Sequence, residues 1–298
     1  MIAATGFFDG VHLGHRAVLQ HVLKLAGQMG KKSAVITFWP HPRVILHRDA
    51  EKVRLLNAID EKKEILYGMG IEQVHVLPFT DKLSKLSPEQ FFTQYLVEQF
   101  QVNTLVVGHD HHLGSNANAN YEAMQKIGAT MGIKVAAVAA VEIANASHQI
   151  SISSTKIRES LRTGNIDFAN ACLGYPYMMR GVVVEGNKIG RTINYPTANM
   201  QLYEPLKQLP ADGVYAVKVR VEDKSYLGMM NIGLRPTIGD MSARTIETHI
   251  FNFDEDIYGQ SIEVLVMKRI RSEQQFLSLD ELKSQLNRDK EQCIEQLA

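Results

Sequence analysis

Apolar residues form five short continuous runs in the first half of the chain. These runs are Ile2–Thr5, Ser33–Phe38, Gln73–Phe79, Thr104–Gly108 and Lys134–Ile143. A continuous run, unlike a strict alternation of apolar and polar residues, is typical of a β-strand that is covered on both faces. The pattern therefore predicts five strands in the interior of a layered domain.

The segments between these runs follow the period of an α-helix. Apolar residues lie four, seven, eight and eleven positions after Val18, so that they share one helical face. A later helix has a clear start, because Ser87 can cap it, Pro88 suits its first position and Gln90 completes a capping box. Alternating strands and helices predict βαβ units, and hence an α/β domain with a doubly wound, Rossmann-like parallel sheet.

The second half of the chain follows a different pattern. Tyr215–Glu222 alternates strictly, which predicts a strand with one buried face. Thr245–Phe253 and Ser261–Ile270 are further predicted strands, and a closing helix is expected over about Leu279–Leu297. Short strands separated by Gly, Pro and Asn predict a small antiparallel β-barrel with a terminal helix, or a sandwich.

The length and the change of pattern both indicate two domains. A chain of 298 residues is about twice the usual size of one domain. Tyr175-Pro176-Tyr177 interrupts a helical stretch where the pattern changes. We therefore expect domains of residues 1–175 and 176–298.

Composition and charge narrow the classes of function. With 45% hydrophobic and 21% charged residues, the chain is neither disordered nor a coiled coil. The 32 basic and 32 acidic residues cancel, so the whole chain has no electrostatic reason to bind nucleic acid or a membrane. Its most apolar stretch, Val135–Val141, is too short to cross a bilayer. Cys172 and Cys293 cannot build a disulfide framework, so a cytoplasmic location fits best.

The segment Gly6–His15 has the residue types of a phosphate site. It follows a predicted strand and opens a predicted helix, where free backbone N–H groups and the helix dipole favour anions. Gly14 leaves the backbone bare between His12 and His15, so a phosphate can approach two imidazole donors. Either histidine alone would more simply be a surface residue at a helix cap, but the order of strand, glycines and histidines favours the phosphate site.

This segment resembles the signature of the nucleotidylyltransferase superfamily, and Phe8-Asp9-Gly10 is similar to the bacterial FAD synthetases in particular. Three later segments resemble motifs of the same family: Thr37–Arg43, Val106–Gly114 and Ile152–Arg158. The resemblance implies transfer of AMP from ATP to FMN, with His12, His15 and Arg158 as catalytic residues. It also implies residues that bind ATP and its phosphates, namely Gly6, Asp9, Gly14, Asp110, Ser154 and Thr155.

A second candidate site begins with the glycine-rich stretch Gly181–Arg191 and continues into Pro196–Asn199. Spaced glycines alone are more often a hairpin than a phosphate cradle. Thr197 and Asn199, however, carry a hydroxyl and an amide oxygen that can both reach one hard cation. Glu247, on a predicted strand, can accept a proton from a hydroxyl nucleophile, although by itself it would be taken for a salt-bridged strand residue.

These stretches resemble the riboflavin kinase signature, and so do Gly213–Ala216, Asn231–Gly233 and Arg269–Asp289. The resemblance implies that Thr197 and Asn199 hold Mg²⁺ and ATP phosphates, while Glu247 activates the 5′-hydroxyl of riboflavin. It further implies nucleotide-covering residues, Gly186, Gly190 and Arg191, and flavin-contacting residues, Arg271 and Phe276.

Asn194 departs from the family pattern, because it stands where the family has glycine. Asparagine adopts the left-handed backbone conformation more readily than most residues. We therefore expect the turn before Tyr195 to be kept.

Together the two resemblances cover nearly the whole chain, in the order of the bacterial bifunctional riboflavin kinase/FAD synthetases. They imply an enzyme that makes FMN and then FAD from riboflavin and ATP, with Mg²⁺ as cofactor. One alternative is a riboflavin kinase whose N-terminal domain only binds nucleotide, because Ser115–Asn120 lacks the basic residues usual in the family. A non-catalytic flavin sensor is the other alternative, against which the presence of Thr197, Asn199 and Glu247 argues.

Overall fold

The computed structural model describes residues 1–45, 53–108, 120–145, 148–186, 190, 193–234 and 244–298. The chain forms two compact units, Met1–Ser154 and Thr155–Ala298. Each unit has its own sheet, so each is described by itself.

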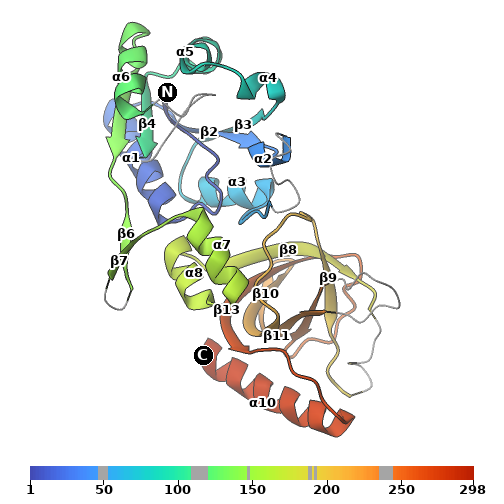
Figure 1. The fold of residues 1–298 in the computed structure, drawn as a ribbon. Coiled ribbons are helices and arrows are strands. Elements are labelled where there is room, and N and C mark those ends of the chain that lie inside the picture. The colour runs from blue at the N-terminus through green and yellow to red at the C-terminus, as the bar shows by residue number, and fades with distance from the viewer. Residues whose placement is uncertain (46–52, 109–119, 146–147, 187–189, 191–192, 235–243) are drawn as a thin grey trace. The chain divides into compact units, whose positions relative to one another are not determined.

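A five-stranded parallel sheet is the centre of the first unit (Figure 1). Its strands are β1 (Ile2–Thr5), β2 (Ser33–Trp39), β3 (Gln73–Pro78), β4 (Thr104–Gly108) and β5 (Lys134–Val138). Their order is β3-β2-β1-β4-β5, so the chain winds outward from β1 in both directions. The doubly wound parallel sheet is thereby confirmed, with its switch point between the carboxyl ends of β1 and β4.

Helices cover both faces of this sheet, which explains the continuous apolar runs. Ile2 and Ala4 pack against α1 (Leu13–Met29) and α3 (Ile59–Gly68). Ala3 lies on the opposite face of the sheet, in a core that three helical segments complete. These segments are α5 (Pro88–Phe91), its π-helical continuation η2 (Phe92–Gln99) and α6 (Tyr121–Thr130). Two single-turn helices, α2 (Pro42–Ile45) and α4 (Asp81–Ser84), follow β2 and β3.

The predicted capping box at the start of α5 is present. The Oγ of Ser87 accepts a hydrogen bond from the N–H of Gln90 at 3.2 Å, and Oε1 of Gln90 accepts one from the N–H of Ser87 at 2.9 Å. Pro88 occupies the first helical position, as the sequence predicts.

The fifth predicted strand is shorter than expected. β5 ends at Val138, and a separate antiparallel hairpin of β6 (Glu142–Asn145) and β7 (His148–Ser151) follows. Ala139 and Ala140 between them are exposed, so the run was apolar without being buried throughout. The prediction of one strand over Lys134–Ile143 was wrong in its extent for that reason.

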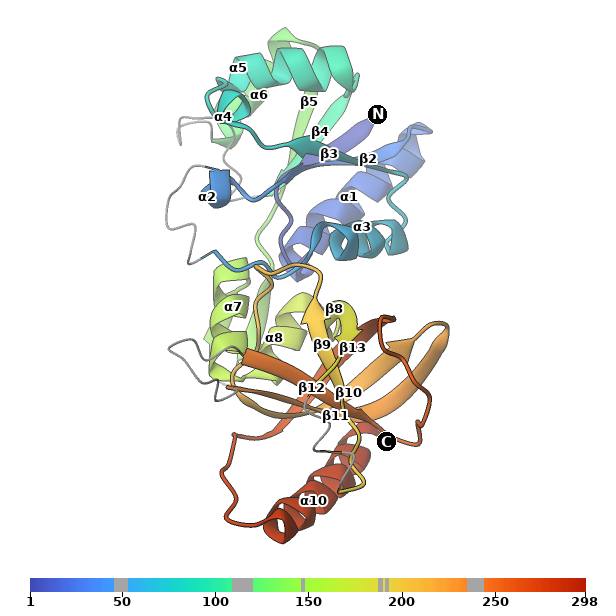
Figure 2. The same ribbon diagram turned by 90° about the vertical axis from the view of Figure 1, so that its right-hand side faces the viewer.

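A closed six-stranded antiparallel barrel is the centre of the second unit (Figure 2). Its strands, in spatial order, are β10 (Gly213–Val221), β11 (Lys224–Leu234), β12 (Arg244–Ile250), β9 (Ala198–Leu202), β8 (Tyr177–Val184) and β13 (Ser261–Arg271). The terminal helix α10 (Leu279–Leu297) packs against β10, β11 and β13. The predicted barrel with a terminal helix is confirmed. In the described parts of both units, no helix combines the length and the apolar character needed to cross a membrane.

Two helices, α7 (Ser154–Thr163) and α8 (Ile166–Leu173), precede the barrel and α8 packs on it. Asn170 of α8 ties the two together, because its Nδ2 donates to the carbonyl of Val266 at 2.9 Å and its Oδ1 accepts from the N–H of Tyr177 at 2.8 Å. The two compact units therefore meet before these helices, between Ser154 and Thr155, whereas the sequence pattern predicts a domain boundary after them, at residue 175. That residues 1–175 and 176–298 are the domains of this chain stays a prediction.

Candidate functional site

The loop that joins β1 to α1 has an unusual backbone. Phe8, Gly10 and Val11 have φ angles of 47°, 85° and 34°. Such values suit glycine, but they are strained for phenylalanine and especially for β-branched valine. Both side chains are buried, which holds the loop in this shape. Strain of this kind persists where packing enforces it, and it is concentrated at functional sites.

His12 and His15 form a stacked pair at the start of α1. Their ring centroids are 3.6 Å apart with an interplanar angle of 16°. His12 caps the helix, because its Nδ1 accepts a hydrogen bond from the backbone N–H of His15 at 3.3 Å. A ring nitrogen that accepts an N–H carries no proton, so the proton of this imidazole is on Nε2. His12 can therefore donate from Nε2 to an anion at the helix N-terminus.

Glycine at position 14 gives the His12 ring its room. A Cβ at Gly14 would lie 3.2 Å from two ring atoms of His12, tighter than an ordinary contact. Gly6 lies at the other end of the loop, where its N–H donates to the carbonyl of Ile36 at 3.1 Å and extends the pairing of β1 with β2.

Asp9 fastens this loop to two other segments. Its Oδ1 accepts hydrogen bonds from the N–H groups of Leu56 and Asn57 at 3.0 and 3.2 Å, just before α3. Its backbone carbonyl accepts from the Oγ of Ser154 at 2.9 Å, which joins the first motif to the Ser153-Ser154 segment. The Asp9 carboxylate is thus engaged with backbone amides, and its predicted role in phosphate binding stays a prediction.

Lys62 is a buried cation that the sequence reading missed. It lies on α3, is only 3% exposed and lines the same enclosed gap as Asp9, Phe7 and Trp39. Burial lowers the pKa of its ammonium group to about 8, against the opposing attraction of the Asp9 carboxylate. Nothing in the sequence marks it, because it stands in the run Asp60–Glu64, which is typical of a solvated helix face.

The remaining residues predicted for the first site are distributed as follows. Thr155 and Arg158 lie on α7, in the second compact unit. Asp110 lies outside the described residues, as does Arg191 of the second site. The roles of these four residues stay predictions.

In the barrel, strand pairing brings the predicted catalytic and metal-binding residues together. β12 pairs with β9 so that Glu247 lies opposite Asn199. The Oγ1 of Thr197, two residues earlier, donates a hydrogen bond to Oε2 of Glu247 at 3.3 Å. A hydroxyl from the residue just before β9, an amide from β9 and a carboxylate from β12 thus converge.

Close backbone approaches require two of the predicted glycines. A Cβ at Gly186 would lie 2.2 Å from Nδ2 of Asn199, and one at Gly190 would lie 2.1 Å from the carbonyl oxygen of Tyr195. The N–H of Tyr195 in turn donates to the carbonyl of Gly190 at 2.8 Å. Asn194 has a φ of 63°, so the expected left-handed turn is confirmed.

Two cavities meet at Thr197. The smaller, of about 330 Å³, is lined by Glu247, His249, Arg271 and Phe276 among others. The larger, of about 480 Å³, is also lined by Thr197 and extends to Asp254–Tyr258. Both volumes are in the range of small-molecule sites, so Thr197 borders two chambers that can each hold a ligand.

His249 supports the segment that contains Thr197. Its Nδ1 lies 2.8 Å from the carbonyl oxygen of Pro196, so this nitrogen carries the proton and donates. Burial lowers the pKa of the imidazole, which keeps it neutral. His249 stands two residues after Glu247 on β12, so the alternation of a strand puts both on one face, but the sequence alone gives His249 no role.

The oxygen donors at Thr197 and Asn199 fit a hard divalent cation. Mg²⁺ is usually held by one or two protein oxygens, with phosphate and water oxygens completing its shell. Glycine at position 186 keeps the Asn199 amide in place, because a Cβ there would clash with it. Among the described residues there is no cluster of three or more His, Cys, Asp or Glu side chains that could hold a metal on its own.

Comparisons with known proteins give a family for each half of the chain. A family model described as FAD synthetase matches residues 1–156, and one described as riboflavin kinase matches residues 173–297. The bifunctional riboflavin kinase/FMN adenylyltransferase of Listeria monocytogenes is 38% identical, over 97% of this chain and 90% of its own length. The protein of the same name from Bacillus subtilis is 36% identical, over 98% of this chain and 91% of its own length.

A solved structure resembles the whole chain. A crystal structure from Streptococcus pneumoniae, named as a macrolide-efflux protein, has a TM-score of 0.88 and 33% sequence identity. The match covers 97% of this chain and 92% of that one. Its name differs from those of the curated relatives, and the likeness shows a shared fold.

Proposed function

Because the chain belongs to the family of bifunctional riboflavin kinase/FMN adenylyltransferases, we propose a division of labour between its two units. The barrel phosphorylates riboflavin to FMN with ATP. The α/β unit then transfers AMP from a second ATP to FMN, which gives FAD and pyrophosphate. The observation that carries the kinase half is the contact of Thr197 with Glu247 where two cavities meet.

In the kinase reaction Glu247 acts as the general base. Riboflavin occupies the smaller cavity, beside Arg271 and Phe276, and the nucleotide occupies the larger one. The carboxylate takes the proton of the 5′-hydroxyl as that oxygen attacks the γ-phosphorus, and the bond from the γ-phosphorus to ADP breaks. Such a base is typically worth about 10²–10⁴-fold in rate.

Thr197 and Asn199 hold Mg²⁺, whose chemistry is to neutralise the charge of the ATP phosphates. The flap that contains Gly186, Gly190 and Arg191 covers the nucleotide. Support for this arrangement comes from the oxygen donors and from the two close approaches of glycine backbone to Asn199 and Tyr195.

In the adenylyl transfer the histidine pair stabilises charge on the α-phosphate. A phosphate oxygen of FMN attacks the α-phosphorus, and the bond to pyrophosphate breaks. His12, with its proton on Nε2, and His15 donate to the oxygens of this phosphorus, next to the N-terminus of α1. Binding of ATP phosphates is assigned in this proposal to Arg158, Ser154, Thr155 and Asp110 as well, while Gly6, Asp9 and Gly14 shape the loop.

A kinase without adenylyl transfer is the second candidate, favoured by the absence of Lys and Arg from Ser115–Asn120. Incubation with riboflavin, ATP, Mg²⁺ and pyrophosphatase, followed by chromatography, separates the possibilities. We expect FMN and then FAD. FMN alone would select the second candidate, and no turnover at all would overturn the kinase assignment.

We also propose that the reactions take place in the cytoplasm. Both cysteines of the chain, Cys172 and Cys293, are free thiols and are buried. Unpaired cysteines are typical of reducing compartments.

A further inference from the structure

The terminal helix α10 carries an acidic residue on the face that packs against the barrel. Leu286, Cys293 and Leu297 of this face belong to the core between helix and barrel. Asp289 lies on the same face and is fully buried. A buried carboxylate is costly unless it is paired, and an apolar residue would fill the same position without that cost.

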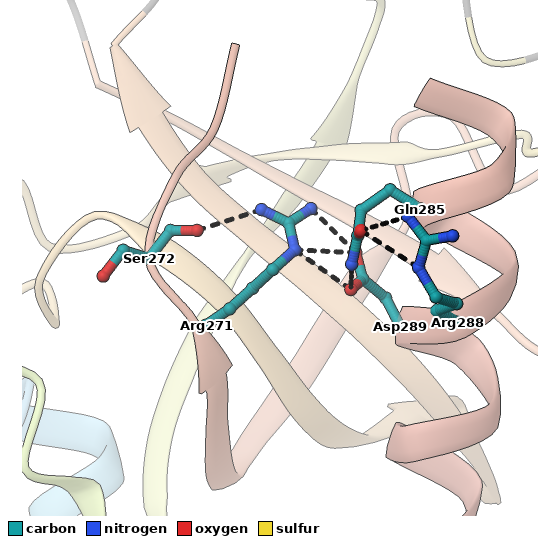
Figure 3. Close-up of polar contacts among 5 residues, drawn as sticks. All are labelled: Arg271, Ser272, Gln285, Arg288 and Asp289. Atoms are coloured by element: carbon teal, nitrogen blue, oxygen red, sulfur yellow. Dashed lines mark hydrogen bonds and ion pairs between the residues drawn. The ribbon is translucent and has the colours of Figure 1, made fainter. Parts of the chain in front are cut away.

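Asp289 is paired with Arg271 of β13 (Figure 3). The Nε of Arg271 lies 3.0 Å from both carboxylate oxygens, and Nη2 lies 2.7 Å from Oδ2. Gln285, one turn earlier on α10, donates from Nε2 to Oδ1 at 2.8 Å, and Nη1 of Arg271 donates to the carbonyl of Ser272 at 2.9 Å. The guanidinium is thus fixed in orientation on three of its nitrogens.

This fixed guanidinium is part of the wall of the smaller cavity. Arg271 and Leu286 both line it, together with Phe276, and the Cζ of Arg271 lies 5.8 Å from the centre of the Phe276 ring. A shift of α10 relative to β13 would therefore move this wall.

A second contact from α10 reaches the segment with Thr197. The hydroxyl of Tyr195 donates to Oδ1 of Asn287. The Tyr195 ring centroid lies 5.0 Å from that of His249, whose Nδ1 donates to the carbonyl of Pro196. Tyr195 is therefore held by α10 through its hydroxyl, and Pro196 is held by β12 through its carbonyl.

We propose that α10 positions both walls of the kinase site, with Asp289 setting the flavin wall through Arg271 and Asn287 setting the Thr197 segment through Tyr195. Asp289 and Asn287 are positioning residues, because each acts through another side chain. The inference rests on the proposed kinase function.

The test measures steady-state FMN formation by the full chain, with riboflavin and Mg·ATP varied separately. In Asp289→Asn the ion pair becomes a neutral contact and Arg271 loses its fixed orientation. We expect KM for riboflavin to rise about 10-fold, in line with the strength of charge-assisted hydrogen bonds, while KM for Mg·ATP changes little. Loss of a buried ion pair should also lower the thermal midpoint, so the difference between the two KM values carries the test. Glu295→Gln, which removes a charge from the exposed side of the same helix, is the matched control and should leave both constants unchanged.

Asn287→Leu and Tyr195→Phe test the second contact. Each should lower kcat or raise KM for Mg·ATP by about 5-fold and leave the riboflavin dissociation constant unchanged. The double variant should be no worse than either single one, because both remove the same hydrogen bond.

Equal changes in both KM values, or an Asp289→Asn enzyme with parental constants, would overturn the inference. If Asp289→Asn does not fold, Gln285→Met carries the same test, since it removes one hydrogen bond to Asp289 and keeps the ion pair. It should raise KM for riboflavin about 3-fold, and a parental KM overturns the inference. An unmutated chain that makes no FMN would instead refute the proposed function.

Discussion

The two candidate sites differ in how the chain builds them. In the α/β unit His12, Gly14 and His15 lie within four residues of one another, at the junction of β1 and α1. In the barrel, Thr197, Glu247 and Arg271 come from separate segments and meet through strand pairing and the packing of α10. The first site is therefore set by local backbone geometry, whereas the second depends on tertiary structure. A change that disturbs the packing of the barrel should therefore abolish the kinase site, even when the residues of that site are unchanged.

The largest effect is expected when the barrel loses α7 and α8. Ile166, Ala169, Cys172 and Leu173 of α8 are buried, and Asn170 bridges two strands. A fragment of residues 176–298 should be less stable than one of residues 155–298 by on the order of 5 kcal/mol, from the apolar surface that it exposes. Urea unfolding and FMN formation by the two fragments measure this. Equal stability would support a folding boundary at residue 175.

The second-largest effect is expected at Glu247. Glu247→Gln keeps the size of the side chain but removes the base, so FMN formation should fall by about 10²–10⁴-fold. Riboflavin binding, followed by flavin fluorescence, should stay nearly unchanged, and adenylylation of added FMN should be parental. Turnover of riboflavin at the parental rate would show that Glu247 is not the base.

The histidine pair tests the local site in the same way. His12→Ala or His15→Ala should reduce FAD formation from added FMN by about 10²–10³-fold, because each removes a donor to developing charge. FMN formation from riboflavin should be unaffected. His21→Ala, on the same helix, is the control. If all three variants make FAD equally well, the pair has no catalytic role.

Lys62 gives a pH-dependent effect confined to the α/β unit. The pKa of its ammonium group falls from 10.5 in the unfolded chain to about 8 in the folded chain. At a pH where the group is charged in both the folded and the unfolded chain, this difference lowers the free energy of unfolding by about 3 kcal/mol. Below pH 8 the full cost is present; between about 8 and 10.5 only the unfolded chain keeps the proton, so stability rises with pH.

Lys62→Met should therefore stabilise the unit by about 3 kcal/mol at pH 7, and the gain should vanish toward pH 10.5. Unfolding in urea can be followed through Trp39, the single tryptophan, which lies on β2. A gain that does not change with pH would mean that Lys62 does not titrate in this range.

The smallest effect is expected at Asn194. Its left-handed backbone suits glycine at least as well, so Asn194→Gly should change the stability of the barrel unit by less than about 0.5 kcal/mol. Asn194→Ala should cost about 1 kcal/mol, because a Cβ without a polar group is disfavoured there. Thermal unfolding of both variants compares them, and an alanine variant as stable as the glycine variant would contradict the role given to the turn.

The sequence predicted the first sheet well because its central strands β1, β2 and β4 are buried on both faces. Four of the five strand ranges agree with the structure within one residue. The fifth was too long, since apolar alanines continued past the buried part of β5. In the barrel, the motif resemblance identified Thr197, Asn199 and Glu247, but only the pairing of β9 with β12 shows that they face one another.

The burial of two charged side chains, Lys62 and Asp289, could not be predicted from the sequence in the same way. Lys62 and Asp289 stand among other charged residues, where a solvated helix surface is the ordinary expectation. For Asp289 one signal was present: it continues the spacing of Leu282, Leu286, Cys293 and Leu297, at a position where an apolar residue is expected. An acidic residue in such a stripe indicates a buried partner, but the partner, Arg271, is fixed only by tertiary packing.

Closure of the barrel has a consequence for how the protein resists aggregation. Each barrel strand has a paired neighbour on both sides, so the barrel has no open edge strand. The parallel sheet instead ends at β3 and β5, whose outer edges can pair with another chain. β3 finishes at Pro78, which has no N–H to donate, and β5 begins at the exposed Lys134, whose charge opposes edge-to-edge association. Removing either protection, as in Lys134→Val, should therefore promote self-association through the α/β unit on mild heating, because the barrel has no open edge strand to offer.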